Sequence, residues 1–257
     1  ARSSTGMESF LVAASIRADD AVSQRDSHCT DQAKPILAYW AIRGLAQPIR
    51  LLLEYLHVDY EDKRFEQGLA PAFDKSCWYD VKDTILGDYP FPNLPYFVDG
   101  DVVVTQSNAI IRHVARQHNL HGATPDEATR CDIMLEEGMD LRNRTVALAY
   151  GRSGKFEDVL PTYAATLRTH LQRYSLFLGT HDWFAGGTLT ACDFVMYELL
   201  DQNQLMVRGC LDAFPNLRTF CTNFSALPRI AMYLTSDRCI VFPCNNQHSE
   251  TTQKQIC

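Results

Sequence analysis

The sequence lacks any apolar run long enough to cross a membrane. Its longest apolar stretches, such as Leu51–Leu53 and Phe10–Ala14, fall far short of the ~18 residues that a membrane span requires. It also lacks a block of like charges, and the formal net charge is only -7 over 257 residues. We therefore expect neither a membrane nor a nucleic-acid partner.

The cysteines lack the spacing of a redox or zinc motif. There are nine of them, with no C-x-x-C pair and no His/Cys cluster at zinc spacing. An odd set of this kind predicts reduced thiols, a cytoplasmic protein and no metal site. The positions are Cys29, Cys77, Cys131, Cys192, Cys210, Cys221, Cys239, Cys244 and Cys257.

The first 33 residues lack a clear identity. Two arginines and the apolar run Phe10–Ala14 faintly resemble a targeting peptide. Four acidic residues argue against one: Glu8, Asp19, Asp20 and Asp26. We interpret residues 1–33 as an extension, either disordered or left from cloning ahead of Met7, and keep a targeting role as the alternative.

From Lys34 onward the sequence alternates strand and helix patterns. Ile36–Trp40 is a short apolar and aromatic run that predicts a buried strand. Pro48 suits the first turn of a following helix, whose apolar residues recur at helical spacing. That stripe consists of Ile49, Leu52, Leu53 and Leu56. Val58–Phe65 then predicts a second strand.

A hairpin and a helix complete this half. Pro95–Val98 and Val102–Val104 flank Asp99-Gly100, a dipeptide typical of tight hairpin turns. Helical spacing resumes over Ser107–Gln117. The order strand, helix, strand, hairpin, helix is compatible with a thioredoxin-like domain over residues 34–117.

The remainder of the chain predicts helices only. Thr124–Glu127 is a capping box with proline at the first helical position, and Thr190–Asp193 is a second capping box. Between them an apolar residue recurs every 3.6 residues up to Gly179, which is typical of a helix end. The expected fold class is α/β followed by all-α, with a helical domain over residues 124–240 and a tail over 241–257.

Several motifs resemble mu-class cytosolic glutathione transferases. The closest segments are Pro35–Leu45, Phe91–Tyr96 and Thr105–Ile110. The match continues through Met139-Asp140, Tyr150 and Trp183–Gly186, and covers residues 35–238 in order. Phe65–Asp74 also looks like the extra loop that marks the mu class. The resemblance implies the glutathione transferase fold, with the electrophile site on the helical domain.

The resemblance also implies a function. It indicates a homodimeric glutathione S-transferase that conjugates the glutathione thiolate to hydrophobic electrophiles, as in detoxification. Glutathione is then a co-substrate, and no resident cofactor is expected. Two alternatives stay open: an isomerase that uses glutathione without consuming it, and a non-catalytic carrier of apolar ligands on the same fold.

Two tyrosines are the catalytic candidates. By resemblance, the phenol of Tyr39 donates a hydrogen bond to the glutathione sulfur and favours its ionised form. Tyr150 resembles the family's second tyrosine, which donates to an oxygen that gains charge on the electrophile. The alternative for both is an aromatic side chain that only packs in the core.

The glutathione ligands follow from the same resemblance. Trp40, Trp78 and Lys82 hold the glycyl carboxylate, and Leu94, before a cis Pro95, pairs with the cysteinyl unit. Gln106 and Ser107 at a helix N-terminus hold the γ-glutamyl carboxylate, and Asp140 reaches the ammonium group bound to the neighbouring subunit. Leu45, Lys75 and Asn93 complete the set. Each residue also has a plain structural alternative: a core tryptophan, a strand-starting proline, an N-cap serine or a solvated aspartate.

Two residues are expected at a dimer interface. Phe91 resembles the mu-class aromatic key that inserts between helices of the partner subunit, and the neighbouring prolines stiffen its loop. Arg112 is the second interface residue implied by the resemblance.

The sequence departs from the family pattern at several points. Ala41 stands where aspartate is usual, Lys75 stands where arginine is common, and two extra residues lie between Lys82 and Phe91. Lysine loses bidentate carboxylate binding, so we expect a lower affinity for glutathione. The tail after Arg238 no longer follows the family, which leaves the physiological electrophile unspecified.

Overall fold

The computed structural model describes residues 33–151 and 154–246. The expected N-terminal extension, up to residue 32, and the last part of the expected tail, from residue 247, lie outside the described residues.

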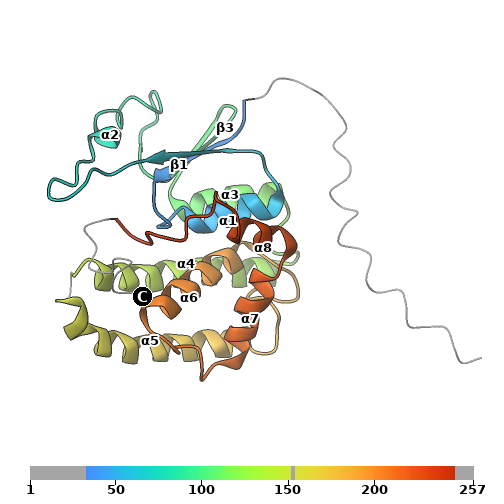
Figure 1. Ribbon diagram of the computed structural model, residues 1–257. Helices are drawn as coiled ribbons and strands as arrows, with labels where there is room; N and C mark the ends of the chain where they lie inside the picture. Colours follow the sequence, from blue (N-terminus) through green and yellow to red (C-terminus); the bar gives the residue numbers. More distant parts are fainter. Residues whose placement is uncertain (1–32, 152–153, 247–257) are drawn as a thin grey trace, which may run out of the picture. The chain divides into compact units, whose positions relative to one another are not determined.

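A mixed four-stranded sheet forms the first half (Figure 1). Its strands are β1 (Ile36–Trp40), β2 (Glu61–Phe65), β3 (Tyr96–Asp99) and β4 (Val102–Thr105), in the order β2-β1-β3-β4. β1 runs parallel to β2 and antiparallel to β3, and β3 pairs with β4 as the expected hairpin. The helices of this half are α1 (Gln47–Leu56), the short α2 (Ser76–Tyr79) and α3 (Ser107–Gln117). The predicted order of elements is confirmed.

Two details differ from the sequence prediction. β2 begins at Glu61 instead of Val58, because His57 ends α1 in the left-handed conformation, with φ 58°. The amide of Val58 then donates to the carbonyl oxygen of Leu53 at 3.0 Å, which ties the connection to the end of the helix. α2 was not expected, since a single helical turn is too short to show a periodic pattern.

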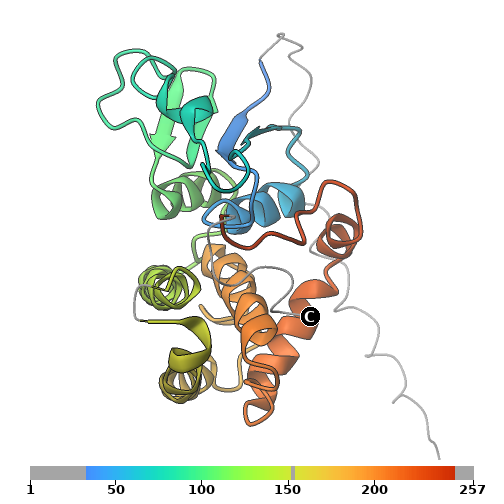
Figure 2. The same ribbon diagram turned by 60° about the vertical axis from the view of Figure 1, so that its left-hand side comes forward.

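In the residues that the structure describes, the second half consists of five helices (Figure 2). They are α4 (Pro125–Ala149), α5 (Phe156–Leu178), α6 (Ala191–Met206), α7 (Pro215–Ser225) and α8 (Pro228–Leu234). Within the described residues after 120, strand-like pairing is confined to an isolated bridge between Trp183 and Gly186. The all-helical prediction is confirmed.

Both predicted capping boxes are present. Thr124 and Glu127 start α4 at the surface, with the threonine hydroxyl 3.2 Å from the Glu127 amide. Thr190 and Asp193 start α6 in the interior, where the Asp193 carboxylate accepts from the amides of Phe184 and Thr190 at 2.8 and 2.7 Å. α6 is therefore anchored at its first turn inside the core.

Close packing of α4 on α6 depends on a glycine. A β-carbon on Gly138 of α4 would lie 2.7 Å from Cγ1 of Val195 on α6. α6 is buried along most of its length and also contacts α1 of the sheet half. None of the helices in the described residues is long and apolar enough to cross a membrane.

Candidate functional site

Tyr39 lies on β1, the strand that pairs with β2 on one side and β3 on the other. Its side chain is 6% exposed, and its ring rests against Gly44. A β-carbon on Gly44 would lie 2.5 Å from Cε1 and 2.9 Å from the hydroxyl oxygen of Tyr39. Gly44 also has φ 46°, a backbone conformation that glycine adopts without strain. The tyrosine and the turn that follows β1 therefore form one packed unit.

That turn is held to the helical half by Arg43. Its Nε donates to Oε1 of Glu198 at 3.0 Å, and one terminal nitrogen donates to Oε2 at 2.6 Å. The same nitrogen lies 2.6 Å from Asp201. Arg43 and Glu198 are both buried; burial acts to lower the pKa of Arg43, but Glu198 and Asp201 together raise it above its ordinary value. The pair fixes the turn after Tyr39 on α6.

The C-terminal segment covers the same turn from another side. The amides of Arg43 and Gly44 donate to the carbonyl oxygens of Pro243 and Cys244, at 3.0 and 3.1 Å. Two residues further on, the amide of Asn246 donates to the hydroxyl of Tyr150 at 2.9 Å. The tail thus joins the turn beside Tyr39 to the second candidate tyrosine.

Tyr150 is the C-cap residue of α4. Burial is the main cause that raises the pKa of the Tyr150 phenol, and its charge interactions include Tyr39 and Arg142. The phenol therefore stays protonated at neutral pH and can donate a proton or a hydrogen bond. The tail links the two predicted catalytic tyrosines, because it bonds to the turn beside Tyr39 and to the hydroxyl of Tyr150.

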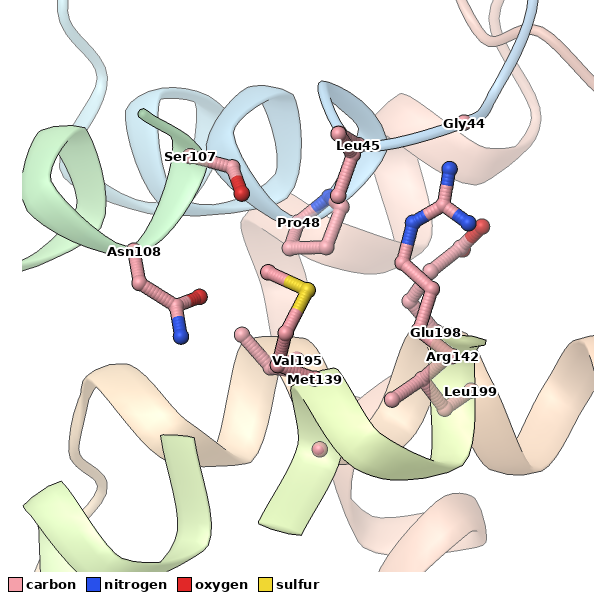
Figure 3. Close-up of a pocket in the computed structure, with 11 residues that line it drawn as sticks. Gly44, Leu45, Pro48, Ser107, Asn108, Met139, Arg142, Val195, Glu198 and Leu199 are labelled. Atoms are coloured by element: carbon pink, nitrogen blue, oxygen red, sulfur yellow. The ribbon is translucent and has the colours of Figure 1, made fainter. Parts of the chain in front are cut away.

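A pocket lies between the sheet half and helices α4 and α6 (Figure 3), and Arg142 is among its lining residues while Tyr39 and Tyr150 are not. Gly44, Leu45 and Pro48 line it from the sheet half, together with Ser107 and Asn108 at the start of α3. α4 contributes Gly138, Met139 and Arg142, and α6 contributes Val195, Glu198 and Leu199. Most of the lining is apolar, which suits a hydrophobic ligand.

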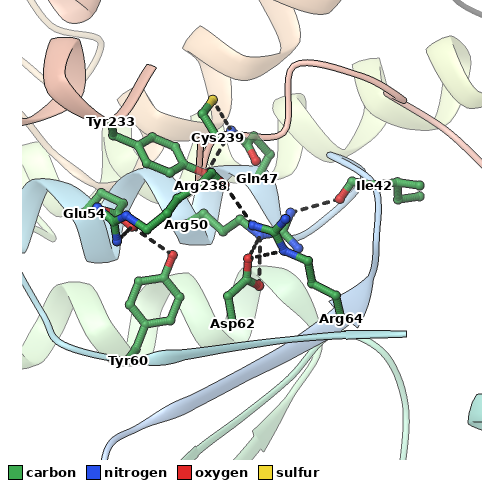
Figure 4. A network of polar contacts seen from close by, with 10 residues as sticks. All are labelled: Ile42, Gln47, Arg50, Glu54, Tyr60, Asp62, Arg64, Tyr233, Arg238 and Cys239. Carbon is green, nitrogen blue, oxygen red and sulfur yellow. Dashed lines mark hydrogen bonds and ion pairs between the residues drawn. The ribbon is translucent and has the colours of Figure 1, made fainter. Parts of the chain in front are cut away.

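A network of polar contacts supports the turn that follows β1 (Figure 4). Arg50 of α1 is fully buried, donates to Asp62 of β2 at 3.0 and 3.1 Å, and donates to the carbonyl oxygen of Ile42 at 2.9 Å. Arg238, after α8, binds Glu54 of α1 through two hydrogen bonds of 2.8 and 2.7 Å. α1 is therefore connected to β2, to the turn after β1 and to the segment after α8.

The two predicted tryptophans share one aromatic neighbour. The Phe65 ring lies 6.4 Å from Trp40 and 5.3 Å from Trp78, edge-on to both. Trp78 is buried in α2, while Lys75 precedes that helix and Lys82 follows it, both half-buried. Lys75, Trp78 and Lys82 thus lie along one short segment, and Trp40 at the end of β1 is joined to it through the Phe65 ring.

The remaining glutathione candidates lie where β3 and α3 begin. The Leu94–Pro95 peptide is cis, as predicted, and the Asn93 side chain accepts from the Leu94 amide at 2.9 Å. Gln106 has φ 72°, an unfavourable value for a residue with a side chain. Ser107 is buried as the first residue of α3 and lines the pocket.

Of the two predicted dimer residues, Phe91 is exposed and Arg112 is half-buried. Phe91 is 69% exposed and packs edge-on against Tyr89, with ring centroids 6.4 Å apart. Arg112 forms ion pairs inside the chain, at 2.7 Å with Asp132 and 2.6 Å with Glu136. Asp140 is exposed on α4. In the part of the chain that the structure describes, no group of His, Cys, Asp or Glu side chains is arranged to hold a metal ion.

Sequence reasoning missed Arg43, Arg142 and Glu198. Arg43 and Glu198 are 155 residues apart, and nothing in either segment predicts their pairing. Arg142 carried a usable signal, since it follows Leu135 and Gly138 on the buried stripe of α4. A cation at an otherwise apolar position of a helix is a reason to look for a ligand.

Two family models match the chain. "Glutathione S-transferase, N-terminal domain" matches residues 35–116, and "Glutathione S-transferase, C-terminal domain" matches residues 139–237.

Curated relatives and solved structures carry the same family name. The chain is 47% identical to Glutathione S-transferase Mu 5 of Rattus norvegicus, over 86% of this chain and 97% of the relative. It is 46% identical to Glutathione S-transferase Mu 3 of Homo sapiens, over 88% and 99%. The structure of a Pi-class glutathione S-transferase from Onchocerca volvulus superposes with a TM-score of 0.74 at 28% identity, over 84% of this chain and all of that one.

Proposed function

The chain belongs to the glutathione S-transferase family, in its mu class, and we propose that Tyr39 is the residue that activates the glutathione thiol. As a glutathione transferase, the protein joins the sulfur of glutathione to an electrophile. The observation that carries the catalytic proposal is the buried phenol of Tyr39, held on Gly44 beside an apolar pocket. A phenol in this place donates a hydrogen bond to a thiolate without carrying a charge of its own.

Glutathione is proposed to lie across the carboxyl end of β1. Trp40, Trp78, Lys75 and Lys82 supply N–H donors and positive charge for the glycyl carboxylate, and their common location around Phe65 and α2 supports this end of the site. Leu45, which lines the pocket, is proposed to contact the backbone of the glutathione tripeptide. Leu94, which lies with Asn93 and Pro95 just before β3, is proposed to pair with the cysteinyl unit through its backbone, its amide exchanging the Asn93 oxygen for glutathione.

The γ-glutamyl carboxylate is proposed to bind at Gln106 and Ser107. Ser107 opens α3, an 11-residue helix whose first amides have no partner within the helix. The unfavourable φ of Gln106 supports a functional role, because backbone strain of this kind persists where a site requires it.

The electrophile is proposed to enter the pocket between Leu45 and α4. There the thiolate attacks the electrophile, and Tyr150 donates a hydrogen bond or proton to an oxygen that gains charge. The raised pKa of Tyr150 supports this role, because a donor must keep its proton until the reaction. The hydrogen bond from the Asn246 amide constrains the direction of the phenol, which supports this role.

The working unit is proposed to be a homodimer in the cytoplasm. Phe91 exposes a large apolar ring on a loop next to β3, and burying it in a partner subunit removes that surface from water. Arg112 and Asp140 are proposed to face the partner, with Asp140 serving the neighbour's glutathione. The seven described cysteines are all free, which supports a reducing compartment. Glutathione acts as co-substrate, without a resident cofactor.

The isomerase and carrier alternatives are not favoured by the named relatives. A direct test combines retention on glutathione-agarose with conjugation to 1-chloro-2,4-dinitrobenzene. We expect retention, one chloride released and one glutathione consumed per turnover. Retention without conjugation would indicate a carrier, and a product formed without loss of glutathione would indicate an isomerase.

A further inference from the structure

The electrophile pocket contains one cation whose charge no close carboxylate offsets. Arg142 lines the pocket from α4, and Figure 3 shows its guanidinium rising from that helix toward the segment of Gly44 and Leu45. Among the described residues, no carboxylate oxygen lies within 4.0 Å of its nitrogens. Its Nε is buried and has no hydrogen-bond partner in that part of the chain. A buried donor without an acceptor is unfavourable, so an acceptor from a ligand is expected to complete it.

Glu198, the carboxylate that lines the pocket, is already paired with other side chains of the protein. Oε1 of Glu198 accepts from Arg43 and from Gln202, and Oε2 accepts a second bond from Arg43. Its charge is therefore offset by Arg43. Asp201, the other carboxylate on Arg43, has a side chain that is 36% exposed, so water screens it. Arg142 is therefore the cation in the pocket lining whose charge is available to bind a ligand.

The rest of the lining restricts what that ligand can be. Leu45, Pro48, Met139, Val195 and Leu199 form apolar walls around the guanidinium. Such a pocket accepts an apolar body that ends in one planar anionic group, since a carboxylate matches the guanidinium fork in two parallel hydrogen bonds. A highly charged ligand would leave further anionic groups against apolar walls.

Arg142 also acts on the reacting centre. Its charge acts to lower the pKa of the Tyr150 phenol, against the larger effect of burial. An electrophile whose acid group is bound by Arg142 therefore lies in the pocket that Gly44 also lines, and Gly44 is the residue on which the Tyr39 ring rests.

From this arrangement we propose that Arg142 is a specificity-determining residue that selects hydrophobic electrophiles carrying a carboxylate. The proposal rests on the proposed function, because it assigns a substrate class to the same pocket. Arg142 contributes through ground-state and transition-state binding of the acid group and leaves activation of the thiol to Tyr39.

The test compares two probes with the same reacting carbon. Ethacrynic acid is an unsaturated aryl ketone with a remote carboxylate, and its methyl ester removes only the charge. Both add the glutathione sulfur at the terminal alkene carbon, while the adjacent carbon takes up a proton. We compare kcat/KM for acid and ester in wild type, Arg142→Gln and Arg142→Lys, each divided by the rate without enzyme. Arg144→Gln is the matched control, because it removes an exposed arginine from the same helix.

We expect wild type to prefer the acid by about tenfold, the fold-change of a charge-assisted hydrogen bond of about 1.4 kcal/mol. Arg142→Gln should abolish this preference, mainly through KM, and Arg142→Lys should retain part of it. Arg144→Gln should keep the wild-type ratio. Circular dichroism checks that each variant is folded, and Arg142→Lys carries the test if Arg142→Gln is not.

Other outcomes distinguish a failure of the inference about Arg142 from a failure of the proposed function. If wild type conjugates both probes without preferring the acid, the inference about Arg142 is wrong and the proposed function stands. An equal loss of preference in Arg142→Gln and Arg144→Gln would also overturn it, because net charge alone would then explain the ratio. If neither probe nor 1-chloro-2,4-dinitrobenzene is conjugated, the proposed function itself fails, and the inference fails with it.

Discussion

The ring of Tyr39 rests on Gly44: a β-carbon at position 44 would lie 2.5 Å from Cε1 of the tyrosine and 2.9 Å from its hydroxyl oxygen. The side chain proposed to activate glutathione is thus positioned by a residue that has no side chain. Because Arg43 and the tail hold the same turn, the place of the phenol depends on contacts from three parts of the chain.

The first prediction concerns this contact. Gly44→Ala must displace the Tyr39 ring, so we expect kcat with 1-chloro-2,4-dinitrobenzene to fall roughly 10–100-fold, as for a misplacement of about 1 Å at a reacting centre. Gly87→Ala is the control, since Gly87 also has a positive φ, 59°, but faces open space. Both variants bear a similar backbone strain of about 1 kcal/mol. Equal kinetic losses in the two would mean that Tyr39 does not depend on Gly44.

The second prediction compares the two capping boxes. Asp193→Ala leaves buried amides of Phe184 and Thr190 without an acceptor, so we expect a loss of about 2–5 kcal/mol in the free energy of unfolding. Glu127→Ala removes the matching residue of the exposed box and should cost about 1 kcal/mol or less. Urea denaturation measures both. A smaller loss for Asp193→Ala than for Glu127→Ala would contradict the role of burial.

The third prediction follows from the pKa of the same carboxyl group. Burial raises the pKa of Asp193 to about 7, above the ~3.9 of an unfolded chain. The folded state therefore holds the proton more tightly, and the contribution of this group to stability declines as the pH rises from about 4 through about 7. Asp193→Asn has no such proton. The stability difference between wild type and Asp193→Asn should shrink from pH 5 to pH 7.5, and a constant difference would contradict the raised pKa.

The fourth prediction tests the dimer. Burial of a phenylalanine is worth ~3–5 kcal/mol in a packed core, so Phe91→Ala should raise the dimer dissociation constant by about two orders of magnitude or more. Leu176→Ala is the control, because Leu176 on α5 is exposed to a similar degree, 71% against 69%. Sedimentation at low protein concentration distinguishes them. An unchanged dimer in Phe91→Ala would remove Phe91 from the interface.

The sequence predicted most of the framework because its signals were local. The strand at Ile36–Trp40, the helix Ser107–Gln117 and both capping boxes depend on residues within a few positions of one another, and the structure confirms them. The start of β2 was predicted three residues early because Val58 and Tyr60 have strand-like composition. The left-handed backbone conformation of His57 sets the path between α1 and β2, and a histidine at this position does not by itself predict that conformation.

The contacts that hold the site were not predictable in the same way. The tail meets the turn of Arg43 and Gly44 through backbone hydrogen bonds, which carry no side-chain pattern. The pairing of Arg43 with Glu198 joins segments that only the tertiary fold brings together. The roles of Tyr39, Ser107 and Asp140 toward glutathione came from family resemblance and stay predictions.

The central claim is that Tyr39 stabilises the thiolate of bound glutathione. A thiol with a pKa of ~8.5 is about a tenth ionised near pH 7.5, and lowering the pKa by ~2 units takes about 2.7 kcal/mol and makes the thiolate dominant. The gain in thiolate is about tenfold, while the lower basicity reduces its reactivity roughly eightfold. Most of the acceleration must therefore come from holding an oriented thiolate next to the electrophile.

The most direct measurement is the pH titration of glutathione bound to wild type and to Tyr39→Phe, followed by the ultraviolet absorbance of the thiolate. We expect the pKa of bound glutathione to lie about 2 units below that of the free thiol in wild type and to return toward it in the variant. Turnover should fall roughly 10–10³-fold, and glutathione affinity should change only a few-fold. An unshifted titration curve with wild-type turnover in Tyr39→Phe would show that another group activates the thiol.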